Sequence, residues 1–278
     1  MAVVGVRGLL RRNHPQQSPK REKLDHVSLE RAVYGLLGFV AILVLWQGVV
    51  ELGLVKKVVL SSPIDVVATA ISDFGSGVIY PHIWISFQEY VLGFAISLAI
   101  GIPVGFIVGL SRRAGYLIDP WLSAVYSTPK VALVPLVIIV VGIGIWSKVV
   151  MAVIMGTIPI AVSVITGVRT IDRRHRDIAR SFRASRWLTF RSVILPSSVP
   201  HMLSGLRLGA NYALRGVIIG EFIAANQGIG FYVTQASMTL RSGQMMLGII
   251  ILGIFGLVLG ELIRKVQERF EAWRPVLA

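Results

Sequence analysis

The most constraining feature of this chain is an apolar stretch, Val91–Leu110, that contains no charged side chain. A helix needs about 20 predominantly apolar residues to cross the hydrocarbon core of a bilayer. Comparable stretches recur, and the candidate spans are Val33–Val50, Phe87–Leu110, Trp121–Ile145, Val149–Val168, Leu206–Ala224 and Gln244–Ile263. Only 15% of the residues are charged, against about 25% in a soluble domain. The sequence therefore predicts an all-α, polytopic membrane protein with about six transmembrane helices.

Lysine and arginine are unevenly distributed between the connections, and this distribution predicts the orientation. They concentrate in residues 1–32, in the long connection after the fourth span and in residues 264–278. Both termini are therefore expected in the cytoplasm. The predicted organisation is a basic cytoplasmic tail at 1–32, a transmembrane domain at 33–263 with a cytoplasmic loop at 169–203, and a cytoplasmic tail at 264–278. Because topology accounts for the net charge of +14, no nucleic-acid partner is needed.

The composition also excludes several kinds of site. The chain has no cysteine, so it has neither a disulfide nor a thiolate metal site. Its five histidines are scattered and match no metal-ligand spacing, so no metal site is expected. No phosphate-binding loop of the G-x-x-x-x-G-K-[ST] type occurs. These absences argue against a metal site and a phosphate-loop ATP site on this chain.

Two of the predicted spans carry residues suited to a translocation pathway. Pro129 and Pro135 interrupt the third span, and a broken helix at membrane depth is tolerated where protein or a water-filled cavity surrounds it. Asn211 and Arg215 lie on one face of the fifth span, and Glu221 follows. An intramembrane arginine is costly and usually functional. Each feature also has a structural alternative. The prolines could form a purely structural kink, and Arg215 could pair with a carboxylate instead of guiding an anion.

Small residues recur at a spacing of four in the second span, at Gly101, Gly105 and Gly109. Such stripes let helix backbones approach closely. They serve either packing within the chain or a seam between subunits.

The connection from Arg169 to Pro200 is long and not of low complexity. Its pattern predicts a short amphipathic helix, a turn, and a second helix that stops before Pro196. Ile178, Phe182 and Ser185 fall on one helical face. The segment could rest on anionic lipid, or it could dock a cytoplasmic partner with its apolar residues as anchors.

This segment resembles a known motif. The run Asp177-Ile178-Ala179-Arg180-Ser181-Phe182-Arg183-Ala184-Ser185-Arg186-Trp187, followed by Val193-Ile194-Leu195-Pro196, is similar to the EAA loop of binding-protein-dependent ABC importer permeases. The resemblance extends from residue 35 onward. It includes Leu60-Ser61-Ser62-Pro63, Gly101-Ile102-Pro103-Val104-Gly105, Gly109-Leu110-Ser111-Arg112, Asp119-Pro120 and Gly220-Glu221-Phe222, which resemble the subfamily for nitrate, taurine and aliphatic sulfonates.

The loop departs from the family pattern at three positions. Asp177 replaces glutamate, Ile178 replaces the first alanine, and Arg183 occupies the position of the motif glycine. Glycine there permits a left-handed turn. We expect Arg183 either to adopt ordinary dihedral angles, which would change the turn, or to point out of the interface.

The resemblance implies a type I importer fold and a multi-pass protein of the bacterial inner membrane. It implies that two permease copies form the pathway for a small nutrient such as a sulfonate, taurine or nitrate. Two separate ATPase subunits would bind ATP and magnesium, and an external binding protein would deliver the substrate. The resemblance also implies that this chain itself binds no cofactor and has no catalytic site. The residues that it assigns to ATPase docking and coupling are Asp177, Ala179, Phe182, Arg183, Ala184, Ser185, Trp187, Leu195 and Pro196.

The alternative is a secondary transporter driven by an ion gradient. Such a protein needs intramembrane acidic residues and often has repeated halves. Near the spans we count only Glu221 and Glu261, and no repeated half is evident. A membrane scaffold without transport activity is a further alternative.

Overall fold

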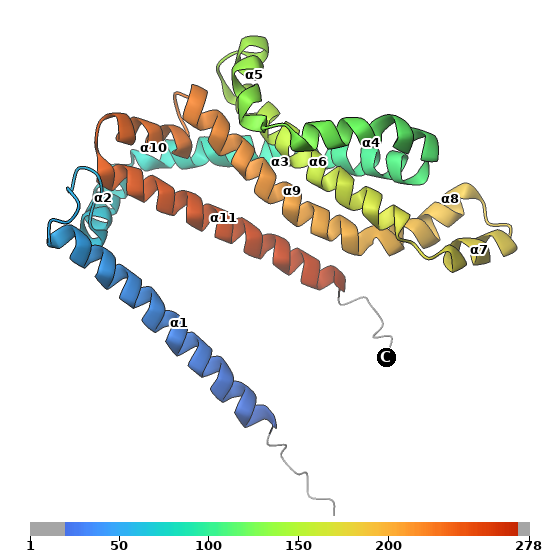
Figure 1. The fold of residues 1–278 in the computed structure, drawn as a ribbon, viewed down its shortest axis with the longest axis horizontal. Helices are drawn as coiled ribbons and strands as arrows, with labels where there is room; N and C mark the ends of the chain where they lie inside the picture. The colour runs from blue at the N-terminus through green and yellow to red at the C-terminus, as the bar shows by residue number, and fades with distance from the viewer. Residues whose placement is uncertain (1–19, 272–278) are drawn as a thin grey trace, which may run out of the picture. The chain divides into compact units, whose positions relative to one another are not determined.

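The computed structural model describes residues 20–271 and divides the chain into two units, Met1–Leu54 and Val55–Ala278. The first unit contains helix α1, Lys20–Glu51, which covers the first predicted span. Because α1 begins at Lys20, residues 20–32 of the predicted tail are helical. The predictions for residues 1–19 and 272–278 lie outside the described residues. Every element of the described part is helical (Figure 1).

Three long helices form the core of the second unit and lie side by side (Figure 1). They are α3 (Ile79–Leu110), α6 (Ile145–Arg169) and α9 (Leu195–Ala224). Glycines allow their close approach: a Cβ on Gly101 would lie 2.9 Å from Cγ2 of Ile160. A Cβ on Gly105 would likewise come too close to Val164, and a Cβ on Gly109 too close to Val168. The glycine stripe therefore serves packing within the chain, which is one of the two roles expected for it.

The third predicted span is not one helix. It consists of α4 (Arg112–Ser127), a 3₁₀ turn η1 (Lys130–Leu133) and α5 (Val134–Val141), bent by 94° at the break. The residue before a proline avoids the helical region, and Thr128 before Pro129 is extended, with φ −73° and ψ 133°. The predicted interruption of this span is thus confirmed at Pro129, whereas Pro135 does not break a helix but lies in the first turn of α5.

The helix expected to stop before Pro196 instead continues through it. A π-helical turn, η2 (Phe190–Ile194), joins α8 (Arg186–Thr189) to α9. Pro196 lies in the first turn of α9, where a missing backbone N–H is tolerated. The wider π turn before Pro196 changes the hydrogen-bonding pattern of the backbone and joins α8 to α9 without a break. The predicted stop before Pro196 is therefore wrong.

The second unit also contains two further short helices and one long helix. They are α2 (Pro63–Gly75), α10 (Ile229–Met238), which follows α9 after a 40° bend, and α11 (Ser242–Glu271). By length and composition, the described residues contain four helices able to cross a membrane, or up to six if each bent pair is one span. This range includes the predicted number.

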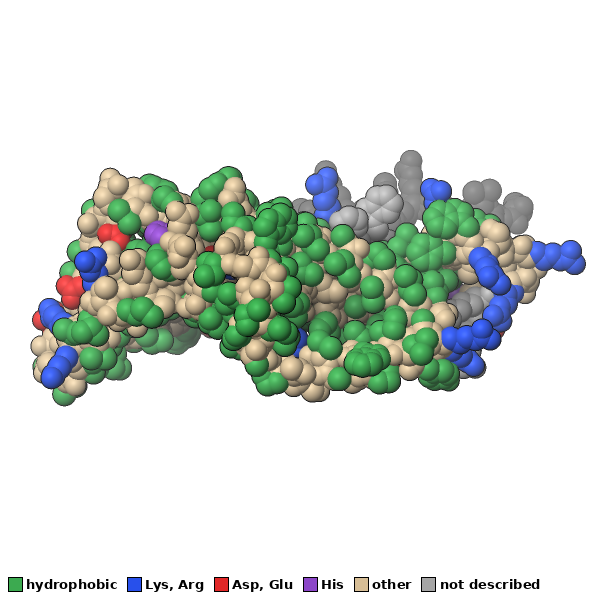
Figure 2. Space-filling view, turned by 90° about the horizontal axis from the view of Figure 1, so that it is seen from above, with side chains coloured by type: hydrophobic (Ala, Val, Ile, Leu, Met, Phe, Trp, Pro, Cys, Tyr) green, Lys and Arg blue, Asp and Glu red, His purple; other side chains and the backbone are tan. Residues whose placement is uncertain are grey.

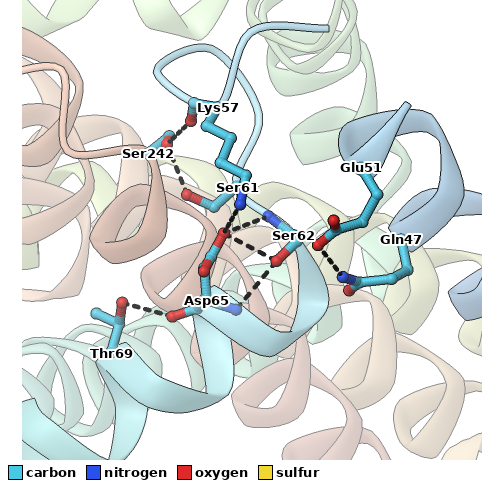
Figure 3. A network of polar contacts seen from close by, with 8 residues as sticks. All are labelled: Gln47, Glu51, Lys57, Ser61, Ser62, Asp65, Thr69 and Ser242. Carbon is cyan, nitrogen blue, oxygen red and sulfur yellow. Dashed lines mark hydrogen bonds and ion pairs between the residues drawn. The ribbon is translucent and has the colours of Figure 1, made fainter. Parts of the chain in front are cut away.

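Helix α2 begins with a capping box that the sequence prediction missed. The Ser62 hydroxyl accepts from Asp65 N–H at 3.2 Å, and the Asp65 carboxylate accepts from Ser62 N–H and Oγ–H (Figure 3). The hydrogen bond from the Ser62 hydroxyl lowers the pKa of Asp65 below its usual 3.8. The Ser242 hydroxyl contacts Lys57 O and Ser61 Oγ, which ties the start of α11 to the segment before α2.

Candidate coupling loop and pathway face

The loop contains α7 (Arg173–Ser181), which ends in a left-handed turn centred on Arg183. The N–H of Ala184 donates to Ala179 O at 3.0 Å, and the N–H of Arg183 donates to Arg180 O at 2.8 Å. This is the Schellman pair of hydrogen bonds, in which the residue at C′ is usually glycine. Arg183 adopts φ 50°, so the expectation of ordinary dihedral angles is wrong and the turn is retained. Its side chain is exposed, and the expectation that it points out of the interface stays a prediction.

Ser185 begins the next helical segment. Its side chain accepts from Leu188 N–H at 3.2 Å and caps α8. The ring of Trp187 stacks on that of Phe190, with 5.8 Å between the ring centroids. The ring of Phe190 in turn contacts Phe106 of α3 edge-on, with 5.2 Å between the centroids. The loop is therefore connected to the core by a chain of aromatic contacts.

The outer face of the loop is apolar and rimmed with cations. Phe182 is 83% exposed and Trp187 is 68% exposed, with Ile178 and Leu188 exposed beside them. Figure 2 shows lysine and arginine gathered at the end of the molecule where α7 and α8 lie. Exposed aromatic residues in a polar surround are typical of a protein interface.

The structure divides the predicted docking residues into two groups. Asp177, Phe182, Arg183, Ser185 and Trp187 are exposed, Ala184 is half-buried and Ala179 is buried. Leu195 packs against the core cluster of α3 and α6, and Pro196 is exposed beside it. Leu195 therefore holds the loop to the core and is not part of the exposed surface.

A second contact at this end of the core was missed by the sequence reasoning. Arg169, at the end of α6, donates to both carboxylate oxygens of Asp119 on α4, at 3.0 and 3.2 Å. The two residues are 50 positions apart in the sequence, so no local pattern marks their pairing. Both side chains are nearly half exposed, and such pairs stabilise by about 1 kcal/mol or less.

The pathway candidates on α9 lie on an exposed face. Asn211 and Arg215 are exposed together with Arg207. The Arg215 guanidinium lies 5.2 Å from the centroid of the Tyr212 ring, and it forms no ion pair with any of the described residues. Because a charge at membrane depth must face protein or water, another surface or an aqueous path is expected to meet this face. Pro129 and Pro135 are also exposed, at the broken α4–α5 segment.

Glu221 does not lie with Asn211 and Arg215. It is 1% exposed and accepts from Gly230 N–H at 2.6 Å and from the Ser86 hydroxyl. The count of acidic residues near the spans was also wrong, because it omitted Glu89 on α3, which is 1% exposed; Lys148 on α6 is likewise buried, at 3% exposure. Glu89 lies within the predicted span Phe87–Leu110, and this position was the overlooked signal.

Comparison with known proteins gives a consistent result. Residues 101–273 match the model of the family described as "Binding-protein-dependent transport system inner membrane component". The chain belongs to this family. It is therefore a permease component of an ABC transporter in the inner membrane, and the secondary-transporter alternative is not supported.

Relatives of this permease include named importer components. It is 30% identical to the taurine transport system permease protein TauC of Escherichia coli, over 88% of this chain and 91% of TauC. It is 28% identical to the putative aliphatic sulfonates transport permease protein SsuC of Bacillus subtilis, over 86% and 87%. A probable ABC transporter permease protein of Brucella abortus is 32% identical, over 78% and 87%.

The fold is also similar to solved transporters. The MetNI methionine ABC transporter, in inward-facing conformations, has a chain that matches with a TM-score of 0.60 at 18% identity, over 70% of this chain and 95% of that one. This likeness confirms the importer-type helical fold of the permease.

Proposed function

We propose that two copies of this permease form the pathway of an ATP-driven importer for a small sulfonate or amino-sulfonate, and that the α7–α8 loop docks the ATPase. The observation that carries the docking proposal is the α7 end, where a Schellman turn presents Phe182 and Trp187 at 83% and 68% exposure. An ATPase cleft would cover these rings and remove them from water.

The aromatic contacts from Trp187 through Phe190 to Phe106 support a coupling role. Through them, movement of a docked ATPase would reach α3 directly. The π turn at Phe190–Ile194 lies between the loop and α9, and π turns are frequent at functional sites. We therefore propose that the loop and α9 move as a coupled unit when the ATPase opens or closes.

The exposed face of α9 supports the pairing of two copies. Arg207, Asn211 and Arg215 are too polar for lipid contact, and a second copy facing the same surface would enclose an aqueous path between them. Cations on that path would attract an anionic substrate. The names of the TauC and SsuC relatives indicate sulfonates as the substrates to test.

Reconstitution tests the function. Proteoliposomes containing the permease, its ATPase and the binding protein should accumulate labelled taurine or an alkanesulfonate only when ATP is inside. Because the chain has no cysteine, an Asn211→Cys variant carries a single thiol that can report pairing: a crosslink between two permease copies supports the dimer. Uptake driven by an ion gradient without ATP would contradict the proposal.

A further inference from the structure

Glu89, Glu221 and Lys148 form a buried cluster, and they lie near the start of α3, the end of α9 and the start of α6. Each comes from a different helix, α3, α9 and α6 respectively. The Lys148 ammonium donates to Gly144 O at 3.0 Å and attracts both carboxyl groups. The exposed fraction of each of the three side chains is 3% or less.

Each carboxyl oxygen of Glu221 accepts one hydrogen bond. Gly230 N–H donates to Oε2 at 2.6 Å, and the Ser86 hydroxyl donates to Oε1. Ser86 Oγ in turn accepts from Ile229 N–H at 2.8 Å. A Cβ at Gly228 would collide with this carboxyl group. These donors favour the ionised form of Glu221, and the contacts fix the turn between α9 and α10.

The carboxyl group of Glu89 is only partly engaged. It lies within hydrogen-bonding reach of the Glu221 carboxyl group, whereas its Oε2 atom is buried and has no hydrogen-bond partner among the described residues. Glu89 lines a cavity of about 190 Å³ together with Lys148, Asn226 and Gln227. A buried carboxylate oxygen without a partner, on a residue that lines such a cavity, is a place for a positively charged ligand or a proton.

The charges of Glu89, Glu221 and Lys148 do not balance unless one further positive charge is bound. With both acids ionised, two carboxylates face one ammonium, which leaves one negative charge buried and unpaired. Such a charge is strongly destabilising, and two carboxylates sharing one site do not both ionise. The described residues contain no group of three or more metal-ligating side chains. A proton shared by the two acids restores the balance.

We propose that Glu89 and Glu221 bind one proton between them, exchanged through the cavity beside Lys148. The protonated Glu89 donates to the Glu221 carboxylate, and Lys148 neutralises the remaining charge. Loss of the proton makes the two carboxylates repel each other. Because Glu221 also holds Gly230, that repulsion acts on the α9–α10 turn.

The charged and titratable neighbours are consistent with this assignment. Lys148 faces the pair from α6. His82, two turns earlier on α3, accepts from Gly228 N–H at 3.2 Å through Nδ1, so it is neutral at that atom. Tyr232 of α10 donates to Asp73 of α2 at 2.6 Å. None of these neighbours supplies a second positive charge to the pair.

Infrared spectroscopy of the full-length permease in lipid nanodiscs tests the proton directly. At neutral pH the wild type should show the carbonyl-stretch band of a protonated carboxylic acid, and Glu89→Gln should lack it. The substituted amide keeps the shape of the side chain and donates N–H to Glu221, so the variant is expected to fold. Glu261→Gln is the matched control, because Glu261 is exposed on α11, and it should keep the band.

Thermal unfolding supplies a second readout. The native pair holds a proton that the unfolded chain releases at neutral pH, so wild-type stability falls as pH rises. The unfolding midpoint of Glu89→Gln should lack this slope. An unchanged band in Glu89→Gln, or equal slopes for the two proteins, would overturn the proposal. A band that appears only when Na⁺ is removed would also overturn it, since the cavity would then hold a metal cation.

Discussion

The backbone N–H of Arg183 donates to the carbonyl of Arg180 at 2.8 Å, closing a left-handed turn on a residue that carries a Cβ. For a residue other than glycine this conformation costs about 1–2 kcal/mol. The loop therefore keeps the backbone geometry of the motif with a less suitable residue, and its exposed arginine adds charge to the surface of α7.

Replacement of Arg183 by glycine should stabilise this turn. We expect Arg183→Gly to transport at a rate equal to or higher than that of the wild type, with a loop that is more stable by about 1 kcal/mol. Uptake in proteoliposomes and hydrogen exchange of the α7 amides measure the two effects. Arg180→Gly is the control, since glycine inside a helix destabilises by about 1 kcal/mol. A collapse of transport in Arg183→Gly would instead show that the Arg183 side chain has a specific partner.

Truncation of Phe182 should weaken ATPase binding without affecting the permease itself. Phe182 is 83% exposed, so Phe182→Ala removes little packing from the isolated chain. If the ring is buried in the complex, its loss should cost on the order of 2 kcal/mol, about 30-fold in affinity. Co-purification with the ATPase measures the loss of binding, and the unfolding midpoint of the permease alone shows whether its own stability has changed.

The control for that experiment is Met238→Ala. Met238 is 80% exposed at the other end of the second unit, so its truncation should leave ATPase binding unchanged. Equal losses in the two variants would show that Phe182 has no special role.

Arg215 should act on transport and not on assembly. Arg215→Gln is expected to lower sulfonate uptake while leaving ATPase association and basal ATP hydrolysis largely intact. Arg215→Lys should retain more uptake, because it keeps the charge and loses only the planar fork of donors. If Arg215→Gln fails to assemble, the arginine is a structural ion-pair member in the complex.

Acidification should loosen the start of α2. The hydrogen bond from the Ser62 hydroxyl lowers the pKa of Asp65, so this contribution to stability is present above the ordinary value of 3.8 and is lost as the pH falls below it. Hydrogen exchange of the first α2 amides should accelerate in this acidic range. Asp65→Asn should show faster exchange already at neutral pH and a weaker response to acid.

The apolar pattern was sufficient to predict most of the fold, because helix length and hydropathy are local properties. The break at Pro129 followed from proline chemistry, but the 94° bend did not. The continuation of the helix through Pro196 depends on the π turn before it, which no local sequence pattern marks. Helix α2 could have been found from the Ser62-Pro63-x-Asp65 capping pattern.

The candidate sites were predictable to different degrees. Exposure of Phe182 and Trp187 agrees with an amphipathic loop, which local periodicity reveals. The pairing of Glu89 with Glu221 joins residues far apart in the sequence, so it depends on how α3 and α9 pack. The left-handed conformation of Arg183 could not be predicted from the sequence, because arginine normally avoids that conformation.

A Ser185→Cys variant provides the most direct measurement of how this permease works, because the native chain has no cysteine and Ser185 is exposed at the start of α8. In the assembled transporter, a crosslinker on the introduced thiol should attach to the ATPase, and the yield should change between the ATP-bound and nucleotide-free states. Crosslinks only to lipid, or to the ATPase with a yield independent of nucleotide, would contradict the docking and coupling role of the α7–α8 loop.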